Sequence, residues 1–358
     1  MSRYHYELAR HLRRSGDLRI DLLLGGQSSV LPFVELEGAG VRMRSWKSRV
    51  GPGYPRYAMN ALWTAAIAPL CGRYDIYHAT YQRWEPAIRH RALVATHHDA
   101  TQERYPHLFR NAAAIRARKR RLYARANLVI CVSESARRDL MEIYGVHEGR
   151  ARVVHHGIEP VHAAEGFCDA DGRPYVLYVG SRSAYKNFPA LLEAFAATQA
   201  ALSLRLIAAG GGAWTDEERA AIAKRGLQDR VVLMPRVDDA TLAQLYRGAM
   251  MLVYPSLYEG FGLPPLEAMS AGCPVLVSRT SSLPEICGEA AHYFDPAVKD
   301  ALGAELERLL EDEAARQEKI EAGRLWVGRY TWESAAAETL TAYRDALQRT
   351  QRRAAYRG

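Results

Sequence analysis

The segment 254–270, Y-P-S-L-Y-E-G-F-G-L-P-P-L-E-A-M-S, joins the end of a predicted strand, a glycine loop and the start of a helix. Gly260 and Gly262 allow the backbone to approach a ligand closely, and Pro264 and Pro265 suit a first helical turn, where missing N–H groups cost little. Free amides at a helix N-terminus bind phosphate. We therefore expect a phosphate-bearing ligand at this turn.

Two carboxylates, Glu259 and Glu267, lie eight residues apart in the same segment. The spacing places Glu259 in the loop and Glu267 about one turn into the helix. Carboxylates at these positions accept hydrogen bonds from sugar and ribose hydroxyls. The alternative, a plain strand-to-helix turn with a capping glutamate, does not account for the whole string.

The bulk composition is that of a two-domain globular protein. A chain of 358 residues is too long for one ordinary core of roughly 100–200 residues. Hydrophobic residues make up 48% and charged residues 25%, and no apolar run approaches the roughly 18–20 residues of a membrane span. The first 14 residues show no secretory pattern, so we expect a cytoplasmic protein. Five scattered cysteines predict reduced thiols that serve in packing.

Hydrophobic patterning predicts alternating strands and helices in both halves of the chain. In the first half we expect strands at 19–24, 75–78, 92–96, 128–132 and 153–154, and helices at 4–14, at 116–126 and from Ser133 onward. In the second half we expect strands at 175–179, 203–208, 231–234, 251–254 and 274–277, and helices at 188–200 and 239–249. A linker is expected at 160–174, and a charged helical region from 304 that ends in a polar tail at 348–358.

Charge is distributed unevenly along the chain, whose net charge is +8. Residues 1–160 hold 26 lysines and arginines against 14 acidic residues, whereas residues 161–358 hold 22 against 26. A basic first half predicts an anionic partner such as a phospholipid surface or a phosphate-bearing acceptor, and a solvated basic face is the alternative. Nucleic acid is a poorer match, because no aromatic platforms accompany the basic segment 116–125.

Several motifs together resemble one known family. They are the segment 254–270, Y-V-G-S-R-S-A-Y-K-N-F at 178–188, L-Y-R-G-A at 245–249, S-A-G-C-P-V at 270–275, S-S-L-P-E at 281–285 and V-S-E-S-A-R at 132–137. The chain resembles the retaining glycosyltransferases of the glycosyl transferases group 1 family (family 4), which includes many bacterial mannosyltransferases and whose signature is E-x(7)-E. The resemblance implies an α/β protein with the GT-B fold, in which two Rossmann-like domains with parallel sheets face each other across a cleft.

The expected domains follow from this resemblance and from the linker. An N-terminal acceptor-binding domain covers 1–162, a nucleotide-sugar-binding domain covers 163–335, and a C-terminal helix with a polar tail, 336–358, crosses back to the first domain. In the family, a strand and a glycine-rich loop precede the G-x-x-R-Y-x-x-x-L segment. Here the sequence begins almost inside that segment. We therefore expect the first strand of the sheet to be absent.

The resemblance implies a set of donor-binding residues. Arg182 and Lys186 match positions that hold the donor diphosphate, and cations of both kinds suit phosphate. Surface cations are the alternative. Glu259 matches the ligand of the donor-sugar hydroxyls, and Glu267 the ligand of the ribose. The other implied donor-binding residues are Gly260, Phe261, Gly262, Leu263, Arg236 and Val237.

The backbone amides of Gly262 and Leu263 would face phosphate or sugar. Arg236 and Val237 fall where the family lines its base pocket, although Pro235 and Arg236 replace a more usual glycine pair.

In the first domain, A-T-H-H-D at 95–99 resembles the family's H-D motif, in which the histidine faces the reacting sugar. The match falls on His98, with Asp99 beside it. A buried structural histidine is the alternative, and His97 remains a second candidate. With Glu259, these residues form the predicted catalytic set.

The chemistry expected is transfer of a hexosyl group with retention. The leaving nucleotide diphosphate is stabilised by Arg182, Lys186 and the helix N-terminus near Leu263. No metal and no cofactor are expected beyond the nucleotide-sugar co-substrate, since no convincing D-x-D motif occurs and Asp238 suits a helix cap. No carboxylate nucleophile is evident, which favours a front-face reaction in which the departing phosphate takes the acceptor's proton.

The favoured donor is GDP-mannose, and the favoured acceptor is a saccharide or lipid-linked saccharide in the synthesis of cell-surface polysaccharide such as lipopolysaccharide. The basic first domain suggests peripheral contact with the inner face of the membrane. A non-catalytic or truncated GT-B-like nucleotide-binding protein is the main alternative, and a hydrolase or epimerase of similar fold is another.

Overall fold

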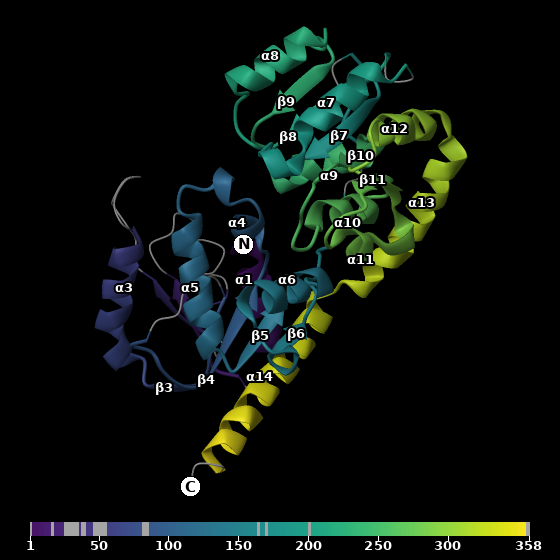
Figure 1. Cartoon of the computed structure of the whole chain (residues 1–358). Helices are drawn as coiled ribbons and strands as arrows, with labels where there is room; N and C mark the ends of the chain where they lie inside the picture. The colour runs from purple at the N-terminus through teal and green to yellow at the C-terminus, as the bar shows by residue number, and fades with distance from the viewer. Residues whose placement is uncertain are drawn as a thin grey trace. The chain divides into compact units, whose positions relative to one another are not determined.

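The chain divides into two compact units (Figure 1). The computed structural model describes residues 2–15, 18–24, 36, 41–45, 56–80, 86–162, 165–168, 171–199 and 202–355. The first unit comprises Met1–Val132, Ala136–Gly157 and Thr331–Gly358, and the second comprises Ser133–Ser135 and Ile158–Tyr330. The division after Gly157 lies five residues before the boundary expected from the sequence, and the returning segment starts at Thr331. Residues 163, 164, 169 and 170 of the expected linker lie outside the described residues.

The main sheet of the first unit has four parallel strands. Their order is β3 (Arg73–Ala79), β4 (Arg89–His97), β5 (Leu128–Cys131) and β6 (Ala151–Val153). A separate parallel pair joins β1 (Ile20–Leu24) to β2 (Val41–Ser45). The sequence predicted all of these strands except β2. Its V-R-M-R-S alternation is the pattern of a strand with one buried face and would have been a sufficient signal.

Helices pack on both faces of this main sheet. The helices of the first unit are α1 (Ser2–Leu12), α3 (Arg56–Ile67), α4 (Thr101–Arg104), α5 (Ala112–Arg125), α6 (Glu134–Tyr144, of which the part from Ala136 belongs here) and α14 (Trp332–Ala355). On one face, Leu8 of α1 and Ala342 of α14 share a core with Val94 of β4. Side chains alternate along a strand, so His97 lies on the opposite face, where it meets Tyr123 of α5.

The second unit contains a sheet of six parallel strands. Their order is β12 (His292–Phe294), β11 (Val275–Ser278), β10 (Met251–Tyr254), β7 (Tyr175–Val179), β8 (Arg205–Ala209) and β9 (Val231–Met234). Its helices are α7 (Phe188–Ala197), α8 (Asp216–Lys224), α9 (Asp239–Gly248), α10 (Leu263–Ser270), α11 (Leu283–Cys287), α12 (Ala301–Glu311) and α13 (Glu313–Trp326). The three predicted strands 175–179, 231–234 and 251–254 agree to the residue. The three-residue β12 is too short to show a period and was not predicted.

The order of these strands reverses between β7 and β10. From β7 the chain moves outward through β8 and β9, then returns to β10 on the other side of β7 and continues to β11 and β12. This is the Rossmann strand order, and ligands bind outside the carboxyl ends of the strands at such a reversal. The fold of the second unit therefore predicts a ligand site at the loops that follow β7 and β10.

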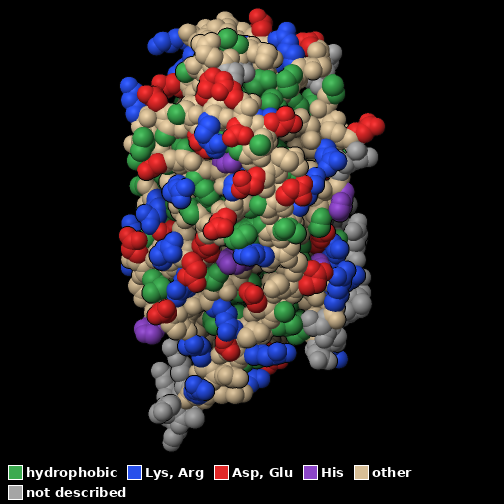
Figure 2. All heavy atoms as spheres, turned by 90° about the vertical axis from the view of Figure 1, so that its right-hand side faces the viewer, with side chains coloured by type: hydrophobic (Ala, Val, Ile, Leu, Met, Phe, Trp, Pro, Cys, Tyr) green, Lys and Arg blue, Asp and Glu red, His purple; other side chains and the backbone are tan. Residues whose placement is uncertain are grey.

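The surface carries mixed charges. On the face drawn in Figure 2, hydrophobic side chains are scattered among acidic and basic ones. Among the described residues, no helix combines the length and the apolar character needed to cross a bilayer.

Gly157 ends the middle segment of the first unit at a very close backbone approach. A Cβ atom there would lie 2.3 Å from the Trp332 backbone nitrogen and 2.6 Å from the Thr331 carbonyl carbon. Because neither atom belongs to a flexible side chain, Gly157→Ala is expected to lower the free energy of unfolding by about 2–3 kcal/mol. Urea denaturation followed by circular dichroism measures the change.

Gly328→Ala is the matched control, because no atom lies within 4 Å of the Cβ position at Gly328. Its free energy of unfolding should stay within about 0.5 kcal/mol of the parent value. Equal effects of the two substitutions would contradict the packing argument.

Candidate active site

The loop after β7 carries the first cluster of candidate residues. It runs through Gly180, whose φ is 136°, and a short 3-10 turn at Ala184–Lys186, and it enters α7 through Asn187 in the left-handed conformation. This path brings the Lys186 ammonium to the Glu259 carboxylate, with Nζ 2.5 Å from Oε1, and to the Tyr254 hydroxyl at 3.0 Å. The lysine and glutamate side chains are each 13% exposed. The structure thus brings two sequence-predicted donor residues, Lys186 and Glu259, into direct contact.

The loop after β10 is held by hydrogen bonds from the segment before α11. The Glu259 backbone N–H donates to the Ser281 hydroxyl at 2.9 Å, and the Ser282 hydroxyl donates to the carbonyls of Glu259 and Phe261 at 3.0 and 2.6 Å. Gly262 stands at the N-cap of α10 with a φ of 123°, a conformation that favours glycine. The S-S-L-P-E motif therefore fixes the shape of the glycine loop.

The second signature carboxylate lies on α10 itself. Glu267 is half-buried, and its Oε2 accepts a hydrogen bond from the Tyr246 hydroxyl of α9 at 3.1 Å. Of the other predicted loop residues, Gly260 and Phe261 are buried, and the Phe261 ring packs edge-on against Tyr330. Leu263 begins α10, as the sequence predicted.

Tyr254 is a site residue that the sequence analysis did not single out. Burial, followed by the charge of Glu259, raises its pKa well above the ordinary value, so its hydroxyl stays protonated at neutral pH. It accepts a hydrogen bond from Lys186. Its position as the last residue of β10, next to the reversal of strand order, was the available signal.

Arg182 is engaged by protein groups. Its Nε donates to Glu218 Oε1 at 2.7 Å, and its other nitrogens donate to the carbonyls of Gly210 at 2.7 Å and Ala213 at 2.9 Å. The guanidinium also stacks on Trp214, and the side chain is 3% exposed. In this arrangement Arg182 holds the glycine loop after β8. Its assignment to the donor diphosphate stays a prediction.

The predicted base-pocket residues follow β9. Arg236 is exposed and Val237 is half-buried. β8 separates β9 from β7, so this loop lies farther from the reversal than the loops of Lys186 and Glu259. Asp238 caps α9 by accepting a hydrogen bond from the Thr241 backbone N–H at 2.7 Å, which confirms its predicted role as a helix cap.

In the first unit, the two histidines of the H-D motif have different surroundings. His97, at the end of β4, is fully buried, and its Nδ1 lies 2.9 Å from the Tyr123 hydroxyl. His98 is half-buried and donates through Nε2 to the Thr80 carbonyl at 3.0 Å. Asp99 accepts a hydrogen bond from the Thr101 backbone N–H at 2.9 Å. Of the two histidines, His98 is therefore the one with exposed surface.

His98 packs within a group of aromatic rings. It stacks on His156, with ring centroids 5.8 Å apart, and Tyr4 packs edge-on against both rings. Burial lowers the pKa of His98 and, more strongly, that of His156. Both rings are therefore neutral at physiological pH, so His98 is a hydrogen-bonding group rather than a cation.

Asp99 lies in a short segment that is fastened by a buried lysine. Lys119 of α5 donates to the Asp99 carbonyl at 2.9 Å, to Gln102 at 3.1 Å and to the Glu103 carboxylate at 3.0 Å. Burial alone would raise the pKa of Asp99, but the Lys119 charge and the Thr101 hydrogen bonds outweigh it and lower that pKa. The sequence analysis described 116–125 only as a basic segment, yet Lys119 lies four residues after the buried Ile115, on the same helical face.

Comparison with known proteins places this architecture in a class. The model described as "Glycosyltransferase Family 4" matches residues 1–162, and "Glycosyl transferases group 1" matches residues 168–326. The structure of Anabaena HepE in complex with UDP and glucose superposes with a TM-score of 0.72 at 18% identity, covering 94% of this chain and 96% of that one. WaaG, a glycosyltransferase involved in lipopolysaccharide biosynthesis, gives a TM-score of 0.71 at 16% identity, covering 94% of both chains.

Two Rossmann-like units with parallel sheets are the architecture of the GT-B class. The chain belongs to the group 1 glycosyltransferases of family 4. It is 36% identical to O-antigen chain mannosyltransferase B of Escherichia coli over 173 residues, which is 48% of this chain and 45% of that protein. The aligned part spans between about a third and 60% of the first three curated relatives it matches.

The buried histidines make the stability of the first unit pH-dependent. Burial lowers the pKa of His5 to about 4 and the pKa of His78 and His97 to about 3. An unfolded histidine has a pKa of about 6.5, so below that value the unfolded chain binds more protons and stability falls. Lowering the pH from about 7.5 to about 5.5 should cost about 4 kcal/mol for these three groups. Urea denaturation at the two pH values measures it, and a pH-independent midpoint would contradict the prediction.

Removing one partner of the Lys119–Glu103 ion pair is expected to lower the free energy of unfolding strongly. The two side chains are 4% and 1% exposed. Lys119→Met leaves a buried carboxylate without its cation and should lower the free energy of unfolding by about 3–5 kcal/mol. The double variant Lys119→Met with Glu103→Gln should regain most of this loss in the same denaturation assay. Equal destabilisation in both variants would show that the ion pair is not the cause.

Proposed function

We propose that this chain transfers a hexosyl group from a nucleotide diphosphate sugar to a saccharide or lipid-linked saccharide acceptor, with retention of anomeric configuration. The contact of Lys186 with Glu259 and Tyr254 at the reversal of strand order carries the proposal. A cation and a carboxylate side by side at this place suit the two parts of a sugar diphosphate. The lysine faces the phosphate, and the glutamate faces the sugar hydroxyls.

Departure of the nucleotide diphosphate builds negative charge on a phosphate oxygen. The Lys186 ammonium and the amides at the start of α10, near Leu263, stabilise this charge without a metal ion. In the structure, Arg182 binds Glu218 and carbonyls of the loop after β8. It supplies a second cation to the diphosphate when a phosphate oxygen replaces one of these partners of Arg182. By the family resemblance, Glu267, which accepts a hydrogen bond from Tyr246, holds the ribose.

The proposed reaction takes place on one face of the sugar. The bond from the anomeric carbon to the phosphate oxygen breaks, the acceptor oxygen bonds to the anomeric carbon on the same face, and the departing phosphate receives the acceptor's proton. By the family resemblance, the neutral His98 faces the reacting sugar, with Asp99 beside it.

GDP-mannose is the favoured donor, and cell-surface polysaccharide synthesis is the favoured process. The support is the likeness to an O-antigen mannosyltransferase over part of the chain. For the acceptor side, the support is the basic character of residues 1–160, which suits peripheral contact with an anionic membrane from the cytoplasmic side.

Thermal-shift measurements with GDP, UDP, ADP and their sugar conjugates test the donor site. At about 100 times its Kd, the right nucleotide should stabilise the fold by about 2.7 kcal/mol. Lys186→Ala and Glu267→Ala should each lose most of this shift, because each removes a charged hydrogen-bonding partner. Lys224→Ala, which removes an exposed lysine from α8, should keep the full shift.

A nucleotide shift that survives both site substitutions would place the donor elsewhere. Release of nucleotide diphosphate from the matching sugar conjugate, measured with an acceptor, separates a transferase from a protein that binds nucleotide without turning it over.

A further inference from the structure

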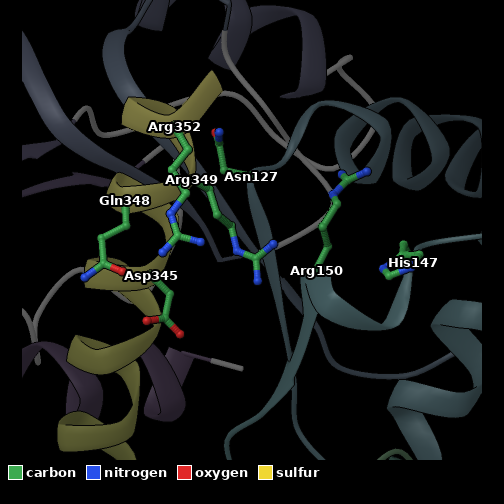
Figure 3. Close-up of a pocket in the computed structure, with 7 residues that line it drawn as sticks. All are labelled: Asn127, His147, Arg150, Asp345, Gln348, Arg349 and Arg352. Atoms are coloured by element: carbon green, nitrogen blue, oxygen red, sulfur yellow. The ribbon is translucent and has the colours of Figure 1, made fainter. Parts of the chain in front are cut away.

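A cavity lined by polar residues lies in the first unit, between α14 and the segments that lead into β5 and β6 (Figure 3). Its volume is about 530 Å³, within the range of small-molecule sites. The lining residues are Asn127, His147, Arg150, Asp345, Gln348, Arg349 and Arg352. Four of them come from one stretch of α14.

The cavity is distinct from the H-D motif. Asn127 directly precedes β5, and Arg150 directly precedes β6, so both mark the amino ends of parallel strands. His98 and Asp99 follow the carboxyl end of β4 in the same sheet. The cavity therefore lies at the opposite edge of the sheet from the residues predicted to face the sugar.

Positive charge dominates the lining. The lining contains three arginines and one acidic residue, Asp345, whose carboxylate lies 2.9 Å from Nη1 of Arg152. Arg150 donates to the carbonyls of Tyr123 and Ala126, both at 2.6 Å, but these neutral groups leave its charge in place. The arginine charges of the lining therefore exceed the acidic charge available to balance them.

The lining also offers hydrogen-bond donors. Arg349 and Arg352 are exposed and lie one turn apart on α14, and their side chains make no hydrogen bond or ion pair with any residue that the structure describes. Two like charges at this spacing disfavour each other, and a bound anion removes that cost. Nδ1 of His147 accepts a hydrogen bond from the Gly149 backbone N–H, so the other ring nitrogen, Nε2, is the one that serves as a donor.

We propose that this cavity binds a phosphate-bearing ligand. Two arginine forks suit the several oxygens of a phosphate or diphosphate, and His147 and Gln348 supply further donors. The lining includes no Phe, Tyr or Trp, so the His147 imidazole is its one ring on which a base could stack, which disfavours a nucleobase as the anchoring group. The phosphate belongs either to a soluble phosphorylated compound or to the headgroup of an anionic lipid.

Calorimetric titration with inorganic pyrophosphate tests the site. The Lys186→Ala variant serves as the parent protein, so that the candidate donor site in the second unit contributes little to the measured binding. Adding Arg349→Glu and Arg352→Glu should weaken binding by about tenfold or more. Adding Arg344→Glu instead changes an exposed arginine of the same helix outside the lining, and binding should persist. The thermal midpoint should be the same in all three proteins, because these side chains are exposed.

Flotation with vesicles of phosphatidylcholine, with and without phosphatidylglycerol, separates the two sources of phosphate. Binding to the phosphatidylglycerol vesicles that is lost with Arg349→Glu and Arg352→Glu, but kept with Arg344→Glu, assigns the site to a lipid headgroup. Pyrophosphate binding that is lost with Arg349→Glu and Arg352→Glu but kept with Arg344→Glu, in a protein that does not float with the vesicles, assigns the site to a soluble ligand. Absence of both kinds of binding, or equal losses in the Arg344→Glu protein, would overturn the proposal.

Discussion

The contact between Lys186 and Glu259 ties together the two loops that leave β7 and β10. It forms because the strand order reverses there, which makes two strands neighbours although 71 residues separate the end of β7 from the start of β10. Local features of both loops hold the backbone in the conformation that brings Lys186 and Glu259 together. Asn187 turns the first loop through a left-handed conformation, and the hydroxyls of Ser281 and Ser282 hold the second. Under the proposed function, this cation and this carboxylate bind the phosphate and the sugar hydroxyls of a sugar diphosphate.

The first unit relies on a different electrostatic arrangement. Burial lowers the pKa of His97, His98 and His156, and the buried Lys119 is matched by Glu103 and by the Asp99 carbonyl. In the proposed reaction, a neutral His98 forms a hydrogen bond without adding a charge near the sugar. Cationic groups in this unit lie instead on exposed surfaces, such as α5 and the end of α14.

Arginine illustrates how one residue type serves several purposes here. Arg182 binds carbonyls and Glu218 and holds a glycine loop, and Arg150 binds the last carbonyls of α5, where a cation complements the helix dipole. Arg349 and Arg352 have no such partner among the described residues. Sequence alone treats all four as cations, and only their surroundings separate those that hold the fold from those available to a ligand.

The sequence by itself determined the family, the α/β class, most strands and the glycine loop with its two glutamates. Buried parallel strands are continuous apolar runs, and glycine and proline act on the backbone locally, so both leave a local signal. The tertiary structure decided which partners Lys186 and Arg182 have, that Lys119 is buried, that His98 rather than His97 keeps exposed surface, and that distant arginines share a cavity. These features depend on contacts between residues far apart in the chain, which no local pattern records.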